Sequence, residues 1–314
     1  MRSAMNTPQI QKRDFLKLAD LSLDEHQRLF ARASQLKTER KAGHVHTTLA
    51  GKTIGLIFEK PSTRTKLSFE AATLQLGGNV ITLQAGDSQI ARGEPTRDTA
   101  RVASGYCDLL MLRTFADERL EEFAKFSKSP VINGLSDGAH PVQLLADLMT
   151  IIERLGSLNG RKVAWLGDGS SNMAYSWIEA AGIFGFQLRI CAPKSFRPNP
   201  DRYQGLSQVS VVDSPREAVA GCDVITTDVW TSMGQEKESA ERLRALAGYT
   251  LTRELLDLGA KNAIVLHCLP AHRGEEITDE VIEDPRSAIF DEAENRMHAQ
   301  KALMELLLGK MPQA

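Results

Sequence analysis

A Ser-Thr-Arg-Thr sequence at residues 62–65 offers the clearest chemistry in this chain. The preceding stretch, Thr53–Phe58, is apolar and β-branched and predicts a buried strand, and apolar residues then recur at helical spacing from Leu67 to Leu74. The four residues therefore stand where a strand ends and a helix begins, and the free backbone N–H groups of a helix N-terminus attract anions. Hydroxyl groups and the planar guanidinium of Arg64 would suit a phosphate, although an ordinary helix cap beside a solvent-exposed arginine is the simpler alternative.

Further polar groups follow predicted strands in the first half of the chain. Arg113 comes directly after the apolar run Leu109–Leu112, and His140 and Gln143 flank the proline that begins the next predicted helix. Arg113 could simply form a surface ion pair, and a lone histidine is more often structural than catalytic. The carboxyl ends of parallel strands meet at one edge of a sheet, however, so we expect these side chains to lie beside residues 62–65.

The second half of the chain begins another series of strands and helices, with Gly167–Asn172 as the turn after its first strand. This turn departs from the dinucleotide fingerprint G-x-G-x-x-G because asparagine occupies position 172, so nicotinamide binding is not expected. Asp228 follows the strand Val224–Thr227 and could cap the next helix or hold a substrate ammonium. Cys268 follows the strand Ala263–Leu266, where it could be a small buried side chain or part of a site.

Strands that alternate with helices in both halves predict the fold class. We expect an α/β protein with two doubly wound parallel-sheet domains and a site in the cleft between them. The boundary is expected in Gly156–Gly160, which gives a first domain of residues 1–155 and a second of residues 156–314. The first domain would then supply cations and helix N-termini, and the second an acid and an amide.

Long helices are expected near both ends of the chain. The first runs from Asp14 to about Lys41, with Ser22 and Glu25 spaced as a capping box. The last, at about residues 292–308, carries Arg296 and is expected to pack back on the first domain.

The composition indicates a globular protein with no sign of a nucleic-acid or membrane partner. Of the 314 residues 42% are hydrophobic and 25% are charged, and a net charge of −2 with a pI near 6.4 favours neither partner. The four cysteines have no paired spacing, which indicates reduced thiols rather than disulfides or a zinc site. The N-terminus lacks an apolar signal region and no run reaches membrane-spanning length, so a cytoplasmic location is expected.

Five short motifs between residues 58 and 300 resemble those of the aspartate and ornithine carbamoyltransferases, and the ornithine-specific members most. The motifs are Ser62–Thr65 followed by Ser68-Phe69-Glu70, then Ser88-Gln89-Ile90, His140-Pro141-Val142-Gln143, Asp228 to Gly234, and His267-Cys268-Leu269-Pro270. The resemblance implies transfer of the carbamoyl group of carbamoyl phosphate to the δ-amine of L-ornithine, which gives L-citrulline and phosphate. It implies no metal and no organic cofactor, because carbamoyl phosphate is already activated.

The resemblance also implies the residues of two subsites. For carbamoyl phosphate they are Ser62, Thr63, Arg64, Thr65, Gln89, Arg113, His140, Gln143, Cys268, Leu269 and Arg296. For ornithine they are Asn172, Asp228, Ser232 and Met233. The residues expected to act in catalysis are Arg113, His140, Cys268 and Asp228.

The polar loop Gln84–Glu94 is long for a simple connection. Such composition is typical of a surface loop, but it also suits a loop that reaches a ligand. The resemblance implies the second role, with Gln89 entering the site of the neighbouring subunit in a homotrimer whose sites are shared between chains.

Other substrates and another class of protein remain alternatives. Aspartate as the acceptor would require cations in the second domain, whereas the stretch that begins at Asp228 offers an acid. An N-acylated ornithine is less compatible with Ser232-Met233-Gly234, which matches the pattern for free ornithine. A non-catalytic paralogue that serves as a regulatory or binding subunit would not be expected to keep all of the motifs.

Overall fold

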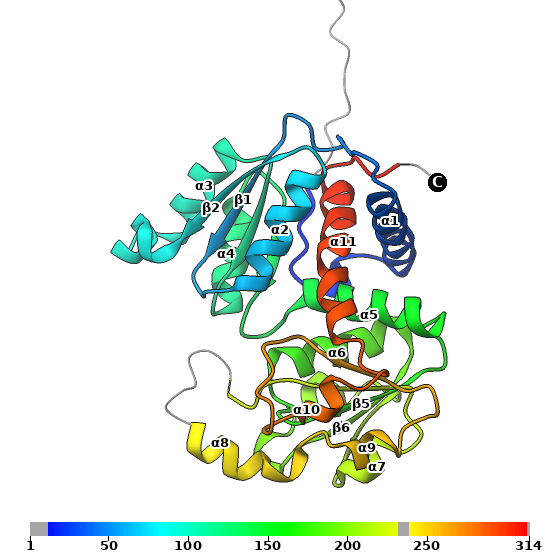
Figure 1. Cartoon of the computed structure of the whole chain (residues 1–314). Coiled ribbons are helices and arrows are strands. Elements are labelled where there is room, and N and C mark those ends of the chain that lie inside the picture. Colours follow the sequence, from blue (N-terminus) through cyan, green and yellow to red (C-terminus); the bar gives the residue numbers. More distant parts are fainter. Residues whose placement is uncertain (1–11, 232–238, 313–314) are drawn as a thin grey trace, which may run out of the picture.

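The structure, a computed structural model, describes residues 12–231 and 239–312, which form two α/β domains, one above the other in Figure 1. The first sheet has the strand order β2-β1-β3-β4 and the second β7-β6-β5-β8-β9, and all neighbouring strands pair in parallel. The expected fold of two parallel-sheet α/β domains is therefore confirmed. The strands are β1 Thr53–Phe58, β2 Asn79–Gln84, β3 Leu109–Arg113, β4 Val131–Leu135, β5 Lys162–Leu166, β6 Gln187–Cys191, β7 Val209–Val212, β8 Val224–Thr227 and β9 Ile264–His267.

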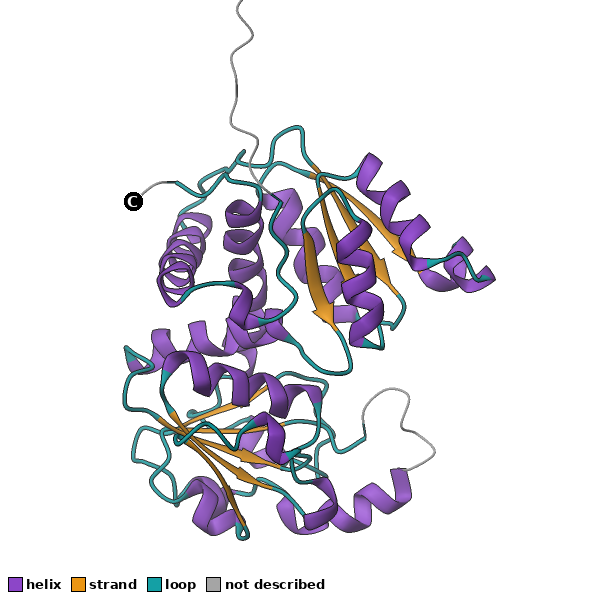
Figure 2. Cartoon of the chain, turned by 180° about the vertical axis from the view of Figure 1, so that it is seen from behind, coloured by secondary structure: helices purple, strands orange, loops and turns teal. Residues whose placement is uncertain are grey.

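Helices cover both faces of each sheet (Figure 2). Those in the described residues are α1 Leu23–Lys41, α2 Thr63–Gln75, α3 Thr96–Tyr106, α4 Asp117–Phe126, α5 Pro141–Leu155, α6 Asn172–Phe184, α7 Pro215–Val219, α8 Ser239–Leu246, α9 Arg253–Leu256, α10 Asp279–Ile282 and α11 Ile289–Leu307. Successive side chains of a strand point to opposite faces. Leu56 and Phe58 of β1 accordingly belong to the core with α1, α2 and α11, and Ile57 belongs to the core with α3 and α4. Within the described residues, no helix is both long and apolar enough to span a membrane.

Helix α11 joins the two domains into one packed unit. It begins beside β9, to which Ser287 is bridged, and then runs between α1 and α2 of the first domain (Figure 1). Arg32 of α1 donates a hydrogen bond to Glu305 of α11, with 2.7 Å between Nε and Oε2. Leu56 of the first sheet and Trp165 of the second belong to the same hydrophobic core. The two domains therefore share buried apolar surface around α5 and α11.

The helix expected after Thr53–Phe58 is confirmed as α2, but its leucines face outward. Leu67 and Leu74 are each 61% exposed, and the helix buries Thr65 and Phe69 instead. The arginine and hydroxyl groups at the start of α2 must face the domain interface, so the rotation of the helix is set by its polar end. The two leucines consequently lie on the outer surface of the first domain.

The first helix begins later than expected. The capping box is confirmed, because Ser22 accepts a hydrogen bond from the backbone N–H of Glu25 and Glu25 accepts one from that of Ser22, and α1 starts at Leu23. Upstream, Phe15 forms a parallel bridge with Ile132 at the outer strand of the first sheet. The buried ring of Phe15 and its two backbone hydrogen bonds to the edge of the sheet outweigh local helix propensity.

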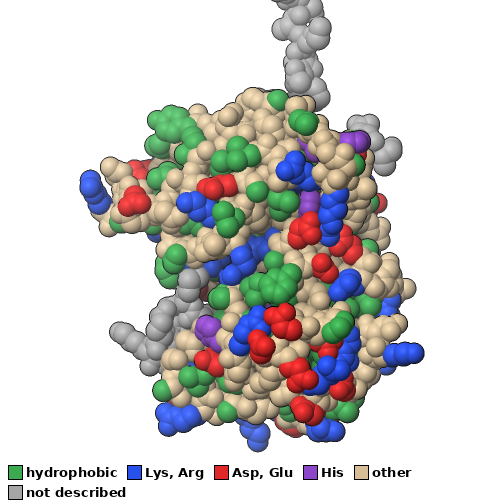
Figure 3. Space-filling view, in the orientation of Figure 1, with side chains coloured by type: hydrophobic (Ala, Val, Ile, Leu, Met, Phe, Trp, Pro, Cys, Tyr) green, Lys and Arg blue, Asp and Glu red, His purple; other side chains and the backbone are tan. Residues whose placement is uncertain are grey.

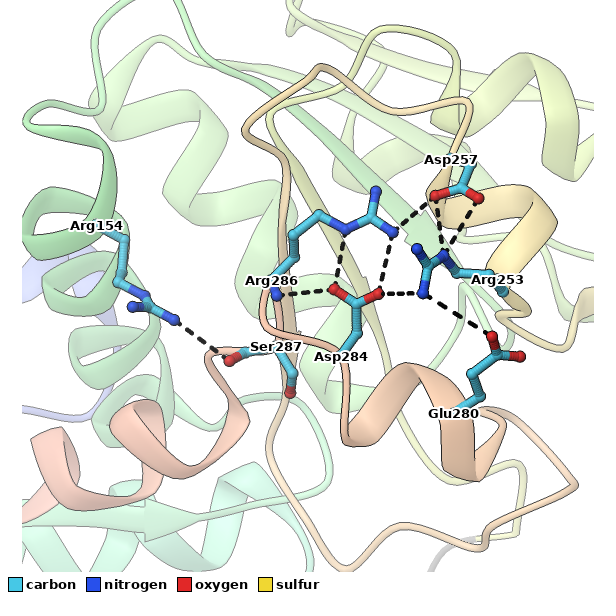
Figure 4. Close-up of polar contacts among 7 residues, drawn as sticks. All are labelled: Arg154, Arg253, Asp257, Glu280, Asp284, Arg286 and Ser287. Atoms are coloured by element: carbon cyan, nitrogen blue, oxygen red, sulfur yellow. Dashed lines mark hydrogen bonds and ion pairs between the residues drawn. The ribbon is translucent and has the colours of Figure 1, made fainter.

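An ion-pair network joins α9 to the segment between α10 and α11 (Figure 4). The side chain of Asp284 is 2% exposed and lies between Arg286, 3.0 Å from its Nε, and Arg253, 2.8 Å from its Nη1. Asp257 contacts the same two arginines from the solvent side. The hydrogen bond from Arg286 is the largest influence on Asp284 and lowers the pKa of its carboxyl group.

Asp284→Asn should lower the free energy of unfolding at pH 7 by about 2 kcal/mol, because a buried carboxylate with charged donors is lost. The pKa of Asp284 is lower in the folded state than its unfolded value of about 3.9, so this stabilisation is present above that value and is lost as the pH falls below it. Urea unfolding at neutral and acidic pH should show the difference between variant and native protein shrinking in acid.

The matched control is Asp257→Asn, which removes a carboxylate bound to the same arginines. Its side chain is 52% exposed, so the loss should be clearly smaller. Equal losses for the two variants would contradict the view that burial gives Asp284 its effect.

Candidate active site

The residues after β1 meet α11 where the two domains join. Ser62 is the N-cap of α2, and its Oγ accepts a hydrogen bond from the backbone N–H of Thr65 at 3.2 Å. The buried Oγ1 of Thr65 lies 2.7 Å from Nη2 of Arg296, which donates to it. Residues 231 positions apart in the sequence thus touch at one helix N-terminus. Basic side chains are visible in the hollow between the domains (Figure 3).

Three arginines gather at this point, and none forms a salt bridge with an acid in the part of the chain that the structure describes. Arg113 and Arg296 are 6% and 3% exposed, Arg64 is half-buried, and the Nε atom of each is buried without a hydrogen-bond partner among the described residues. Burial first, and then repulsion by neighbouring guanidinium groups, lowers the pKa of Arg113 and of Arg296 to about 10. A buried cation is costly unless an anion compensates it, so the cluster is suited to bind a multiply charged anion.

His140 adds a neutral donor to the same cluster. It is the N-cap residue of α5 and 4% exposed, and its backbone N–H donates to Oγ of Ser176 at 2.8 Å. Burial, followed by the charges of Arg296, Arg113 and Arg64, holds the pKa of its imidazole well below the usual range. At neutral pH the ring therefore carries one N–H and no charge.

The second domain contributes an acid and a thiol. Oδ1 of Asp228 accepts hydrogen bonds from Sγ of Cys268 at 3.1 Å and from the backbone N–H of Val229 at 2.8 Å. Burial raises the pKa of Asp228, and burial together with the charge of Asp228 raises that of Cys268, which is therefore a thiol. Burial lowers the pKa of Arg64 and the charge of Asp228 opposes this, so the two halves of the site face each other across the domain interface.

Some of the other predicted site residues do not lie beside the arginine cluster. Asn172, at the start of α6, donates through Nδ2 to the backbone oxygen of Ser136 at 2.8 Å and so stands between the domains. Gln89 is exposed on the short helical turns that project beyond the first sheet, away from the site of its own chain (Figure 1, Figure 2). Ser232 and Met233 lie outside the described residues.

Sequence reasoning gave no role to His267, which orients the backbone beside Cys268. Nδ1 of His267 accepts from the backbone N–H of Leu269 at 2.9 Å, so the proton is on Nε2, which donates to Glu276 at 3.1 Å. Leu269 has a left-handed backbone, with φ at 58°, which is strained for a residue other than glycine. A histidine at the end of an apolar strand was the only signal in the sequence.

Asp147 and Glu292 were also missed. Asp147 lies one helical turn after Gln143 on the buried α5, and Glu292 lies one turn before Arg296 on α11. Each is 1% exposed, and both accept hydrogen bonds from Gln143. The spacing of four residues between Gln143 and Asp147, inside an otherwise apolar helix, was the available signal.

Within residues 12–231 and 239–312, two groups of side chains have the ligand types of a metal site. In the first, Asp228, His267 and Cys268, both ring nitrogens of the histidine are already hydrogen-bonded within the protein. In the second, Oε1 of Glu276 accepts from that histidine and from the backbone of His272, while Glu275 is partly exposed. Neither arrangement leaves a free set of ligands, so we assign no metal to the site.

Fold and site together define a two-domain α/β protein built to hold an anionic substrate at the carboxyl ends of its strands. Residues 13–153 match the family model described as aspartate/ornithine carbamoyltransferase, carbamoyl-P binding domain, and residues 159–307 match the one described as Asp/Orn binding domain. The chain belongs to the aspartate/ornithine carbamoyltransferase family.

Individual relatives agree with the family match. An ornithine carbamoyltransferase of Halorhodospira halophila is 52% identical over 94% of this chain and 99% of its own length. The structure of ornithine carbamoyltransferase from Pyrococcus furiosus superposes with a TM-score of 0.90 at 42% identity, over 95% of this chain and 97% of that one. The anabolic enzyme from Campylobacter jejuni gives a TM-score of 0.88 at 41% identity, over 94% and 98% of the chains.

Inorganic phosphate should raise the melting temperature of the native protein, because it binds the folded state alone. Arg113→Met removes one of three repelling buried charges, so without phosphate the variant should melt at the same temperature as the native protein or higher. Its gain from phosphate should be largely lost. Thermal unfolding with and without phosphate measures both effects.

Arg28→Met is the control for this experiment. Arg28 is an exposed arginine of α1 paired with Asp24, and its loss should leave the gain from phosphate as in the native protein. A full gain from phosphate in Arg113→Met would show that Arg113 is not part of the anion site.

Proposed function

We propose that this protein transfers the carbamoyl group of carbamoyl phosphate to the δ-amine of L-ornithine, giving L-citrulline and phosphate. As a member of its family the chain is a carbamoyltransferase, and relatives 52% and 51% identical to it are named ornithine carbamoyltransferases. One observation carries the proposal: an arginine cluster from the first domain and α11 faces Asp228 and Cys268 of the second domain. Among the described residues, no acid forms a salt bridge with these arginines. The cluster suits a phosphorylated compound, and the acid suits an amine.

The phosphate would bind at the N-terminus of α2. Ser62–Thr65 supply backbone N–H groups, hydroxyls and the guanidinium of Arg64. Arg113 lies close enough for the charge of Arg64 to contribute, after burial, to lowering its pKa. These donors would also stabilise the charge that accumulates on phosphate as it leaves.

The carbonyl oxygen becomes an oxyanion when the amine attacks. Arg113, His140 and Thr65, with Arg296 hydrogen-bonded to Thr65, would surround it with donors. Because His140 is neutral, it contributes an N–H without adding a fourth positive charge. Donors fixed before the reaction lower its barrier by several kcal/mol in such sites.

The carbamoyl NH2 group needs hydrogen-bond acceptors. The side-chain oxygen of Gln143 has no partner among the described residues, and we assign it this role together with the backbone oxygens of Cys268 and Leu269. These acceptors would favour an NH2 group of the ligand over an oxygen atom at the same position.

The acceptor amine must lose a proton before it can attack, because a free alkyl ammonium has a pKa of about 10. Asp228 and Cys268 would orient the δ-amine, and the neighbouring Arg64 disfavours its charged form. We assign the α-amino and carboxylate groups of ornithine to Asn172, Ser232 and Met233.

Steady-state assays at saturating carbamoyl phosphate test the substrate. L-Ornithine should yield citrulline and phosphate in equal amounts, with L-aspartate and an N-acylated ornithine slower on the order of a hundred-fold or more. Asp228→Asn should lower kcat/KM for ornithine by about tenfold or more without improving the rate with aspartate. Comparable rates with ornithine and aspartate would reject the assignment in favour of a broader carbamoyltransferase.

We further propose that the protein works as a cyclic homotrimer with shared active sites. Large apolar side chains are exposed on α2, at Leu67 and Leu74, and on the edge strand β2, at Ile81 and Leu83. Exposed apolar surface of this kind is typical of subunit contacts. Gln89, beyond the end of β2, would then enter the site of the next subunit, which is a closed, heterologous arrangement.

Hybrid complementation tests the sharing of sites. Arg64→Ala should inactivate the site of the chain that carries it, and Gln89→Ala should damage only the neighbour's site. After the two variants are dissociated, mixed and reassembled, roughly a quarter of the sites in a random cyclic trimer should be intact.

The native protein taken through the same cycle gives the recovery expected from reassembly alone. Activity that rises toward the intact fraction supports sharing. If hybrids confirmed by mass show only the average of the two parents, the loop serves its own chain and the shared site is rejected.

We also propose a reducing, cytoplasmic location. All four cysteines are free: Cys107, Cys191 and Cys222 are buried and Cys268 is half-buried. Burial raises the pKa of Cys191 to about 12 and that of Cys222 to about 11, so both are inert thiols.

A further inference from the structure

Two buried carboxyl groups lie behind the proposed carbamoyl site and take part in none of the steps above. Nε2 of Gln143 donates to both of them, at 2.8 Å to Oδ1 of Asp147 and at 2.6 Å to Oε1 of Glu292. The two carboxyl groups also influence each other's pKa, so they lie side by side. One amide and two acids, from α5 and α11, thus form a buried network.

This network fixes which end of the Gln143 amide faces the site. Only the nitrogen of an amide can donate to two carboxyl oxygens, so its oxygen must point the other way. That oxygen is buried and has no partner among the described residues. A buried carbonyl oxygen left without a donor is unfavourable, so its orientation is held for a ligand with an N–H group.

Glu292 also holds the backbone segment that carries the second set of proposed acceptors. Oε2 of Glu292 accepts from the backbone N–H of His267 at 2.9 Å, and Nδ1 of His267 accepts from the backbone N–H of Leu269. The backbone oxygens of Cys268 and Leu269 belong to this segment. Glu292 therefore connects the acceptor from α5 with the acceptors after β9.

The charge of the pair is balanced by a shared proton. Burial raises the pKa of both Asp147 and Glu292, and the charge of Asp147 raises that of Glu292 further, so the pair holds one proton and one negative charge. Arg296 favours that remaining charge, and Asp228 is the further acid that acts on Asp147.

We propose that Asp147 and Glu292 are positioning residues that share a proton and aim the Gln143 oxygen and the backbone of residues 267–269 at the NH2 group of a carbamoyl phosphate. They would thereby make the site select a carbamoyl phosphate over an acyl phosphate, which has a carbon group in place of NH2. This inference rests on the proposed function for the identity of the ligand.

Two substitutions of nearly equal size separate this role from simple packing. In Asp147→Asn, the oxygen of the new amide accepts from Gln143. Its N–H takes the place of the shared proton and donates to an ionised Glu292. The network therefore keeps its hydrogen bonds and its single negative charge. In Glu292→Gln, one amide oxygen cannot replace two accepting oxygens, so a donor faces either Gln143 or the N–H of His267. Both variants remove one carboxyl group from the same pair, but only the second disturbs the acceptors.

The readout is the ratio of the affinities for carbamoyl phosphate and acetyl phosphate, measured by titration calorimetry. Native protein should prefer carbamoyl phosphate. Glu292→Gln should reduce this ratio by about tenfold and lower kcat by a similar factor, whereas Asp147→Asn should stay within about threefold of native in both. Affinity for inorganic phosphate should be unchanged in both variants, because the Ser62–Thr65 turn is not touched.

Thr150→Val is the matched control for disturbing the contact between α5 and α11. Thr150 lies on α5, and its Oγ1 accepts a hydrogen bond from Nδ2 of Asn295 on α11 at 2.9 Å. Among the described residues it makes no hydrogen bond with Gln143. The variant should lose stability but keep the affinity ratio. Thermal unfolding of each variant establishes that it is folded.

Three outcomes would overturn the inference. They are equal losses in Asp147→Asn and Glu292→Gln, an unchanged affinity ratio in Glu292→Gln, and no preference for carbamoyl phosphate in the native protein. A native protein that prefers carbamoyl phosphate but makes no citrulline from ornithine would reject the proposed function alone, because the affinity ratio involves no amine.

Discussion

The site depends on three guanidinium groups held together with no salt bridge to any acid in the described part of the chain. Each is fixed by a different element: Arg64 by the first turn of α2, Arg113 by the end of β3, and Arg296 by α11. Their mutual repulsion would separate side chains on flexible loops. A hydrophobic core that runs through both domains opposes this repulsion. The packing energy of the fold therefore holds the three guanidinium groups together in the absence of an anion.

The nearby acids are arranged so that they do not neutralise this cluster. Asp147 and Glu292 both accept hydrogen bonds from Gln143, and Asp228 accepts one from the thiol of Cys268. The side of the site toward the first domain therefore remains cationic, while the second domain presents a single acid. This polarity matches a substrate with a phosphate at one end and a partner that approaches as an amine.

Where the structure departs from what a local pattern suggests, long-range contacts explain the outcome. The outward stripe of α2, with Leu67 and Leu74, reflects a helix whose rotation is set by Thr65 and its contact with Arg296. The residues before α1 are drawn into the edge of the first sheet through Phe15 rather than continuing the helix. At Phe15 this tertiary contact outweighs a local helix preference of at most a few tenths of a kcal/mol per residue.

The sequence by itself determined the alternation of strands and helices, and hence which polar residues stand at strand ends. Because parallel strands bring their carboxyl ends to one edge, Arg113, Asp228 and Cys268 could be assigned to a cleft from their positions alone. Only the tertiary structure decided how Gln143 is oriented and that Glu292 links it to the backbone after β9. That information depends on how α11 packs against α5, more than 140 positions away in the chain, and no local pattern encodes such a contact.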